Sequence, residues 1–117
     1  MIPDYQTLML PVLRLAAEGE ASIGSATEAV SEQFALTLEE RNEMLPSGKL
    51  TIIRSRVHWA KAYLKQARLV EATKRGHFRI TDRGRAVLQN PPERIDNAFL
   101  DQFEEFRQFR ERGRKND

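Results

Sequence analysis

The residues of this chain that offer the clearest chemistry are cations spaced along one predicted helix. Four basic side chains recur at intervals of four, three and four positions: Arg54, His58, Lys61 and Lys65. That spacing places them on one face of an α-helix. Five apolar residues share a second face, turned roughly 100° away: Ile53, Val57, Ala60, Leu64 and Ala67. The helix therefore has an apolar side to bury and a cationic side to present.

The start of this helix has two candidate N-caps. Thr51 and Ser55 each carry a hydroxyl that can accept a hydrogen bond from the first turn, and the helix ends near Ala67 in either case. If Ser55 is the cap, Arg54 lies before the helix, outside its cationic face, and would contact a phosphate from there.

The charge of the chain is concentrated in the same region. The formal net charge is only +2, but residues 49–85 carry 11 basic and 2 acidic side chains, a net charge of +9. The preceding 48 residues are net −6, and the segment from 86 onward is net −1. A basic block inside a near-neutral chain is typical of a protein that binds a polyanion. The alternative is a solvated basic surface without a partner.

A short basic hairpin is predicted to follow the helix. Two β-prone runs, 69–73 and 77–80, flank a Lys74-Arg75-Gly76 turn, and the short run 21–23 could add a third strand. A helix that fits the major groove, followed by a basic hairpin, is the pattern of a winged helix-turn-helix domain. The predicted fold is therefore mainly α with a small antiparallel sheet (α+β), a winged helix-turn-helix with N- and C-terminal helical additions.

Three helices are predicted to precede the basic one. The first runs from Pro3 to about residue 17, either kinked at Pro11 or broken into two pieces near Leu10. Capping boxes beginning at Ser25 and at Thr37 open the next two, which end near residues 34 and 44.

Two further helices are predicted after the hairpin. Thr81 caps a helix through residue 89 whose apolar residues are Ala86, Val87 and Leu88. Asp96 or the next residue opens the last helix. We divide the chain into residues 1–95, the winged-helix domain, and residues 96–117, a C-terminal helix with a frayed tail from residue 112.

The last helix carries four phenylalanines at intervals of four, three and three: Phe99, Phe103, Phe106 and Phe109. An apolar stripe of this kind usually packs on its own domain. The alternatives are the seam of a homodimer or a helix that leads to a further domain.

The basic block supplies candidate contacts to double-stranded DNA. Five side chains are candidates for phosphate contacts: Lys61, Lys65, Lys74, Arg75 and Arg79. Four more lie toward the half of the helix usually offered to base edges: Ser55, Arg56, His58 and Ala62. A small side chain such as Ala62 can meet a thymine or 5-methylcytosine methyl group.

Some of these residues have a competing structural interpretation. Arg56 either reads a base or lies along the edge of the core. Lys74, Arg75 and His77 form the hairpin tip, which would touch a minor groove or the backbone, and Arg54 joins the phosphate contacts. Trp59 and Tyr63 could stack on an exposed base, but aromatics flanked by Val57 and Ala60 are more often packed, and we expect both in the core.

The sequence offers no catalytic constellation. It has no Cys and two His, so we expect neither a metal site nor a cofactor, and no nucleophile, base and orienting acid share a defensible spacing. The chain by itself is predicted not to be an enzyme. No apolar run approaches the ~18 residues of a membrane span, and the first residues lack a basic secretory n-region. We therefore expect a cytoplasmic protein that does not contact a membrane.

Several short segments, in their order and spacing, resemble one known family. They are Ile2-Pro3-Asp4-Tyr5, Pro11-Val12-Leu13-Arg14, Leu45-Pro46-Ser47-Gly48, Arg56-Val57-His58-Trp59-Ala60 with Leu64-Lys65, Arg75-Gly76-His77-Phe78-Arg79-Ile80-Thr81 with Gly84, Asn90-Pro91 and Ile95-Asp96-Asn97. Across about residues 2–110 the chain resembles the N-terminal domain of Mrr-type restriction endonucleases.

The resemblance implies a winged-helix DNA-binding module of the kind that precedes a nuclease domain cutting DNA with modified bases. It places five residues on the recognition helix, Arg56, Trp59, Ala60, Leu64 and Lys65, and two on the wing, Arg75 and Gly76. The Asp…Glu/Gln-x-Lys core of that nuclease is missing, because neither Asp82 nor Asp96 is followed by it. The chain is then either a piece of a longer enzyme or a protein that stands alone.

The resulting hypotheses are three. The first is a DNA-targeting domain of an Mrr-like restriction system. The second is a stand-alone winged-helix transcriptional regulator. The third is a winged-helix protein-interaction or dimerisation module, in which the basic face meets an acidic protein and the Phe99–Phe109 stripe assembles the dimer.

Overall fold

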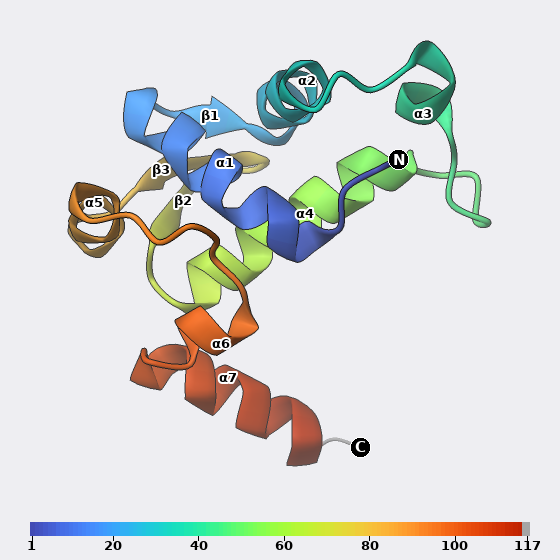
Figure 1. The fold of residues 1–117 in the computed structure, drawn as a ribbon. Helices are drawn as coiled ribbons and strands as arrows, with labels where there is room; N and C mark the ends of the chain where they lie inside the picture. The colour runs from blue at the N-terminus through green and yellow to red at the C-terminus, as the bar shows by residue number, and fades with distance from the viewer. Residues whose placement is uncertain (116–117) are drawn as a thin grey trace.

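The computed structural model describes residues 1–115 and shows a mainly helical α+β fold around a small sheet (Figure 1). In chain order the elements are α1 (Tyr5–Glu18), β1 (Ala21–Ser22), α2 (Ile23–Gln33), α3 (Leu38–Asn42), α4 (Ile52–Gln66), β2 (Val70–Lys74), β3 (His77–Ile80), α5 (Asp82–Gln89), α6 (Asn97–Leu100) and α7 (Glu104–Lys115). The predicted class is confirmed, and the basic helix and hairpin lie where the sequence placed them.

The sheet is antiparallel with the strand order β1-β3-β2. Val70 pairs with Ile80 and Ala72 with Phe78, and the register shifts between Ala72 and Lys74. The predicted third strand is confirmed, since Ala21 pairs with Phe78. The hairpin is therefore anchored on one side by β1, while β2 forms the free edge that leads to the turn.

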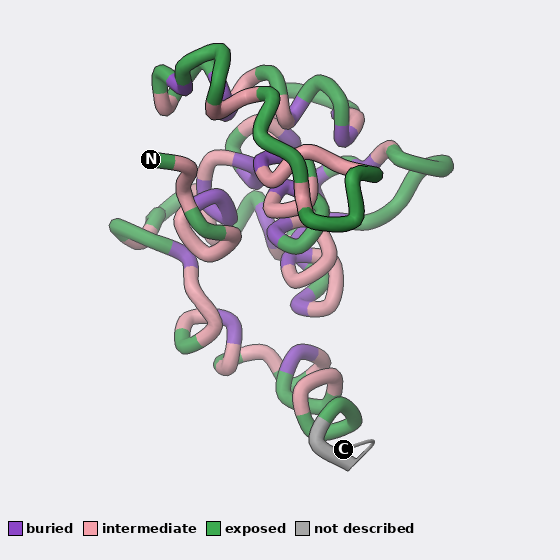
Figure 2. The backbone as a smooth tube through the Cα atoms, turned by 90° about the vertical axis from the view of Figure 1, so that its right-hand side faces the viewer, coloured by how far each residue is buried: buried purple, intermediate pink, exposed green. Residues whose placement is uncertain are grey.

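The core lies where α1 and α4 pack against each other and against the sheet, and buried residues gather in the middle of the molecule (Figure 2). Leu8, Val12 and Leu13 on α1 are completely buried, as is Phe78 on β3. α1 is capped by Asp4, whose carboxylate accepts a hydrogen bond from the Thr7 N–H at 2.8 Å. It runs through Pro11 as one continuous helix, so the alternative of two broken pieces is wrong.

The second predicted capping box is confirmed and the first is wrong. Thr37 and Glu40 cap each other at the start of α3, which ends two residues earlier than expected. α2, however, begins at Ile23, because Ser22 and Ser25 form the reciprocal cap three residues upstream of the predicted one. The pairing of β1 with β3 fixes Ser22 at the end of the strand, and the Ile23 N–H donates to the Gly76 carbonyl.

α5 is capped by Thr81 as predicted, but its buried residue is Gly84. Val87 and Leu88 are only half-buried and Ala86 is exposed, so the predicted apolar face is wrong in part. The reason is that this short helix approaches the chain at Leu69 so closely that glycine faces it.

The predicted last helix is interrupted. It is capped by Asp96 and divides into α6 and α7, with Asp101 as the C-cap of α6. Arg107 and Arg110 on α7 donate hydrogen bonds back to Asp101. α7 then continues as helix through Lys115, so the fraying expected from residue 112 is not seen up to there, and residues 116–117 lie outside the described part.

The four phenylalanines of this segment pack against the core. Phe106 is completely buried, and Phe99, Phe103 and Phe109 are partly buried around it. The interpretation as a packing stripe is therefore confirmed. A homodimer through these residues stays a prediction. Because Phe106 is completely buried, it could not contact a second copy of the chain.

Candidate nucleic-acid interface

α4 begins at Thr51. The Thr51 hydroxyl accepts a hydrogen bond from the Arg54 N–H at 3.2 Å, and the Ser55 N–H already donates to the Thr51 carbonyl. This decides between the two candidate caps. Arg54 is therefore part of the helix and belongs to its cationic face.

The helix divides into three faces. The apolar face packs into the core, and all five of its residues are at most 1% exposed: Ile53, Val57, Ala60, Leu64 and Ala67. The cationic face lies beside it and carries the predicted four: Arg54, His58, Lys61 and Lys65. The third face lies opposite the buried one and is uncharged, with residues at intervals of four, three and four: Ser55, Trp59, Ala62 and Gln66. Two of the predicted base contacts, Ser55 and Ala62, lie on this third face.

The cationic face is electrostatically uncompensated. In the part of the chain that the structure describes, no carboxylate lies within 4.0 Å of these four side chains. Partial burial, followed by the charges of Arg54 and Lys61, lowers the pKa of the His58 imidazole. Burial and then Lys65 lower the pKa of the Lys61 ammonium. Like charges at these spacings destabilise an isolated helix, so this face carries a repulsion that the ion pairs of the described residues do not relieve.

Arg56 does not join this face. Its guanidinium donates to the backbone carbonyls of Ile2 and Pro3, at 2.8 and 3.2 Å. It therefore holds the N-terminal segment against α4, and the structure favours the second of its two interpretations, the edge of the core.

Trp59 is exposed, and its predicted burial is wrong. Its side chain is 55% exposed, although its neighbours Val57 and Ala60 are buried. The helical rotation of about 100° per residue carries Trp59 away from the apolar face. Tyr63 is instead the aromatic that packs, half-buried between Tyr5 and α7.

The hairpin tip presents further cations. Lys74 and Arg75 are exposed, and Gly76 adopts a φ of +75°, the left-handed conformation that the turn requires of a glycine. The half-buried His77 ring lies 3.0 Å from the Arg75 carbonyl through Nδ1. Arg79, in contrast, pairs across the strands with Glu71 at 2.6 Å, so its charge is compensated.

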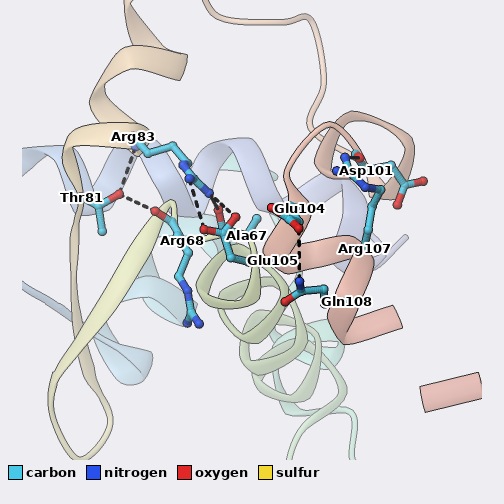
Figure 3. Close-up of polar contacts among 10 residues, drawn as sticks. Ala67, Arg68, Thr81, Arg83, Asp101, Glu104, Glu105, Arg107 and Gln108 are labelled. Atoms are coloured by element: carbon cyan, nitrogen blue, oxygen red, sulfur yellow. Dashed lines mark hydrogen bonds and ion pairs between the residues drawn. The ribbon is translucent and has the colours of Figure 1, made fainter. Parts of the chain in front are cut away.

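A basic cleft of about 770 Å³ continues from the end of α4 over the outer side of the hairpin. Five cations line it: Lys65, Arg68, Arg79, Arg83 and Arg85. Arg83 is paired with Glu105 of α7 and also donates to the Ala67 carbonyl, whereas the Arg68 side chain extends away from this pair (Figure 3). Arg68, Arg83 and Arg85 belong to the basic block but are not among the contacts predicted from the sequence, and the structure places all three along this cleft.

Other kinds of site find no support in the described residues. They contain no group of three or more His, Cys, Asp or Glu side chains that could hold a metal ion. None of their helices is long and apolar enough to cross a membrane.

Comparison with known protein families identifies a match over most of the chain. The model of the Mrr N-terminal domain matches residues 5–90, most of the chain. No curated protein and no solved structure matches significantly. The matched range begins with α1 and ends just after α5, so it contains α4, the hairpin and most of the core.

Proposed function

The chain belongs to the Mrr N-terminal domain family, and from this premise we propose that it is the DNA-targeting domain of an Mrr-like restriction system. The matched model describes an N-terminal domain and not a catalytic nuclease domain. The proposal therefore assigns to this chain the recognition of DNA and leaves the cleavage to another domain.

The observation that carries the proposal is the uncompensated cationic face of α4. A helix of this diameter fits the major groove of B-DNA, and lysines and arginines along one flank reach the phosphates of one strand. Lys74 and Arg75 at the hairpin tip extend the same charge beyond the helix. The arrangement α4, β2, β3 is that of a recognition helix followed by a wing.

The mechanism is electrostatic docking followed by insertion of the helix. Phosphate contacts supply affinity and fix the register, and they carry no sequence information directly. The uncharged third face of α4 then lies toward the base edges, with Ser55 and Ala62 in reach of them. Arg79 contributes less than its position suggests, because Glu71 already neutralises it.

The test is a fluorescence-anisotropy titration with duplex DNA at several salt concentrations. Arg54, Lys61, Lys65, Lys74 and Arg75 offer about five phosphate contacts, which predicts a log–log salt slope of about −4 to −5. Lys61→Glu combined with Lys65→Glu should abolish binding at moderate salt, since it places two negative charges on the phosphate-facing flank.

The matched control is Arg14→Glu combined with Arg112→Glu. It makes the same charge change at two exposed positions on α1 and α7, and it should reduce affinity only slightly. If the Lys61/Lys65 variant still binds DNA as the control does, α4 is not in the interface and the proposal fails. Binding of an acidic protein instead of DNA would favour the protein-interaction alternative.

A further inference from the structure

The third face of α4 exposes an aromatic side chain whose role the cationic face does not explain. Trp59 is 55% exposed, and the other large exposed apolar residues, Met1, Leu38 and Met44, lie outside α4. An indole left in water forgoes the favourable free energy that burial of its apolar surface would supply. An exposed indole beside an uncompensated cationic flank indicates a partner that offers negative charge and an apolar group side by side.

The indole of Trp59 packs against other aromatic side chains of the protein. Its ring meets Tyr63 edge-on, with the centroids 6.1 Å apart and the planes at 79°. Tyr63 in turn contacts Tyr5, Phe106 and Phe109, with centroids between 5.1 and 5.7 Å away. This aromatic cluster restricts the indole before any ligand binds, so little further conformational entropy is lost on contact.

We propose that Trp59 is a specificity-determining residue that contacts the C5-methyl group of a pyrimidine in the major groove. The inference rests on the proposed function. If α4 lies in the groove with its cationic face on the phosphates, its third face meets the base edges, and the apolar group presented there is the C5-methyl group. Ala62, one turn along the same face, leaves room for that methyl group beside the indole.

Two bases carry this chemistry, thymine and 5-methylcytosine, and two pairs of duplexes separate them. One pair has the same sequence with thymine or with uracil throughout, and the other has cytosine or 5-methylcytosine throughout. We expect the wild-type chain to bind the methyl-bearing member of at least one pair roughly three- to tenfold more tightly. The pair that shows the preference identifies the base.

The variant that tests the residue is Trp59→Ala. It should weaken binding of the methyl-bearing duplex more than binding of the methyl-free duplex, and so remove the methyl preference at an unchanged salt slope. Trp59→Phe should restore part of the preference. Leu38→Ala, which removes an apolar side chain that is 76% exposed on α3, is the control and should retain the preference. Circular dichroism verifies the fold of each variant.

A second readout needs no variant, because Trp59 is the only tryptophan of the chain. Its emission should shift to shorter wavelength when methyl-bearing DNA saturates the protein and shift less with methyl-free DNA. An unchanged emission at saturation, with binding still visible by anisotropy, would overturn the role of Trp59 and leave the proposed function standing. Equal emission changes without any methyl preference would also overturn it, in favour of stacking, and absence of DNA binding would refute both proposals.

Discussion

Adding one methyl group at Gly84 should destabilise the fold where the β2–β3 hairpin joins α4. A Cβ on Gly84 would lie 2.7 Å from the Ile80 Cγ1 atom and 3.2 Å from the Leu13 Cδ1 atom, and closer still to the Leu69 carbonyl oxygen. That carbonyl accepts a hydrogen bond from the Thr81 N–H at 3.0 Å. Gly84→Ala therefore forces α5 away from the start of β2 and strains this bond.

The size of the effect follows from these contacts. Overpacking a close-packed site costs about 1–3 kcal/mol, and weakening one backbone hydrogen bond adds about 1 kcal/mol. We expect Gly84→Ala to lower the free energy of unfolding by about 3 kcal/mol, which corresponds to a fall in Tm of roughly 10 °C for a domain of this size. Urea unfolding followed by circular dichroism measures it directly.

Gly24→Ala is the matched control. A Cβ at Gly24 in α2 would lie 3.8 Å from its nearest neighbours, an ordinary contact. Replacing a helical glycine by alanine should then be neutral or stabilise the fold by up to about 1 kcal/mol. If the free energy of unfolding of Gly84→Ala lies within about 1 kcal/mol of wild type while the control behaves as expected, the close approach of α5 to Leu69 does not hold the hairpin in place.

Two further predictions concern residues of α4. Arg56→Ala removes the donor to the Ile2 and Pro3 carbonyls and should cost about 1–2 kcal/mol of stability while leaving DNA affinity of the folded protein almost unchanged. A loss of affinity as large as that of Lys61→Glu would place Arg56 in the interface instead. The pKa of His58 lies below its usual value, and nearby phosphates would raise it, so DNA binding should take up a proton and strengthen as the pH falls from about 8 to 6. His58→Gln should flatten this dependence in anisotropy titrations.

Local patterns predicted the elements that position the site. The apolar and cationic spacings of α4 are properties of a single helix, and the Gly76 turn is a property of a few neighbouring residues, so both could be read from the sequence. Where two nearby residues were both plausible helix caps, long-range contacts determined which of them caps the helix. Ser22 caps α2 in place of Ser25 because its strand pairs with β3, more than fifty residues further along the chain.

The roles of individual side chains depended on distant partners and were harder to predict. Arg56 lies among the other cations of α4 in sequence. Only the folded N-terminal segment, over fifty residues away in sequence, shows that its guanidinium is already hydrogen-bonded to a backbone carbonyl. Trp59 was assigned to the core from its neighbours in sequence. Its angular position around the helix, about 120° away from Ile53, contained the better signal, because burial follows the helical face and not adjacency in sequence.

The cationic side chains and the exposed indole of α4 lie on different faces of the helix, so substitutions on the two faces should affect DNA binding in different ways. Charge reversal at Lys61 and Lys65 acts on phosphates, which are the same in every sequence, so it should weaken all duplexes alike and flatten the salt slope. A change at Trp59 acts on a face without charge, so it should alter the ranking of duplexes at a constant slope. If one substitution changed both properties together, the two faces would not contact different parts of the DNA, and the orientation of α4 in the groove would have to be rotated from the one proposed.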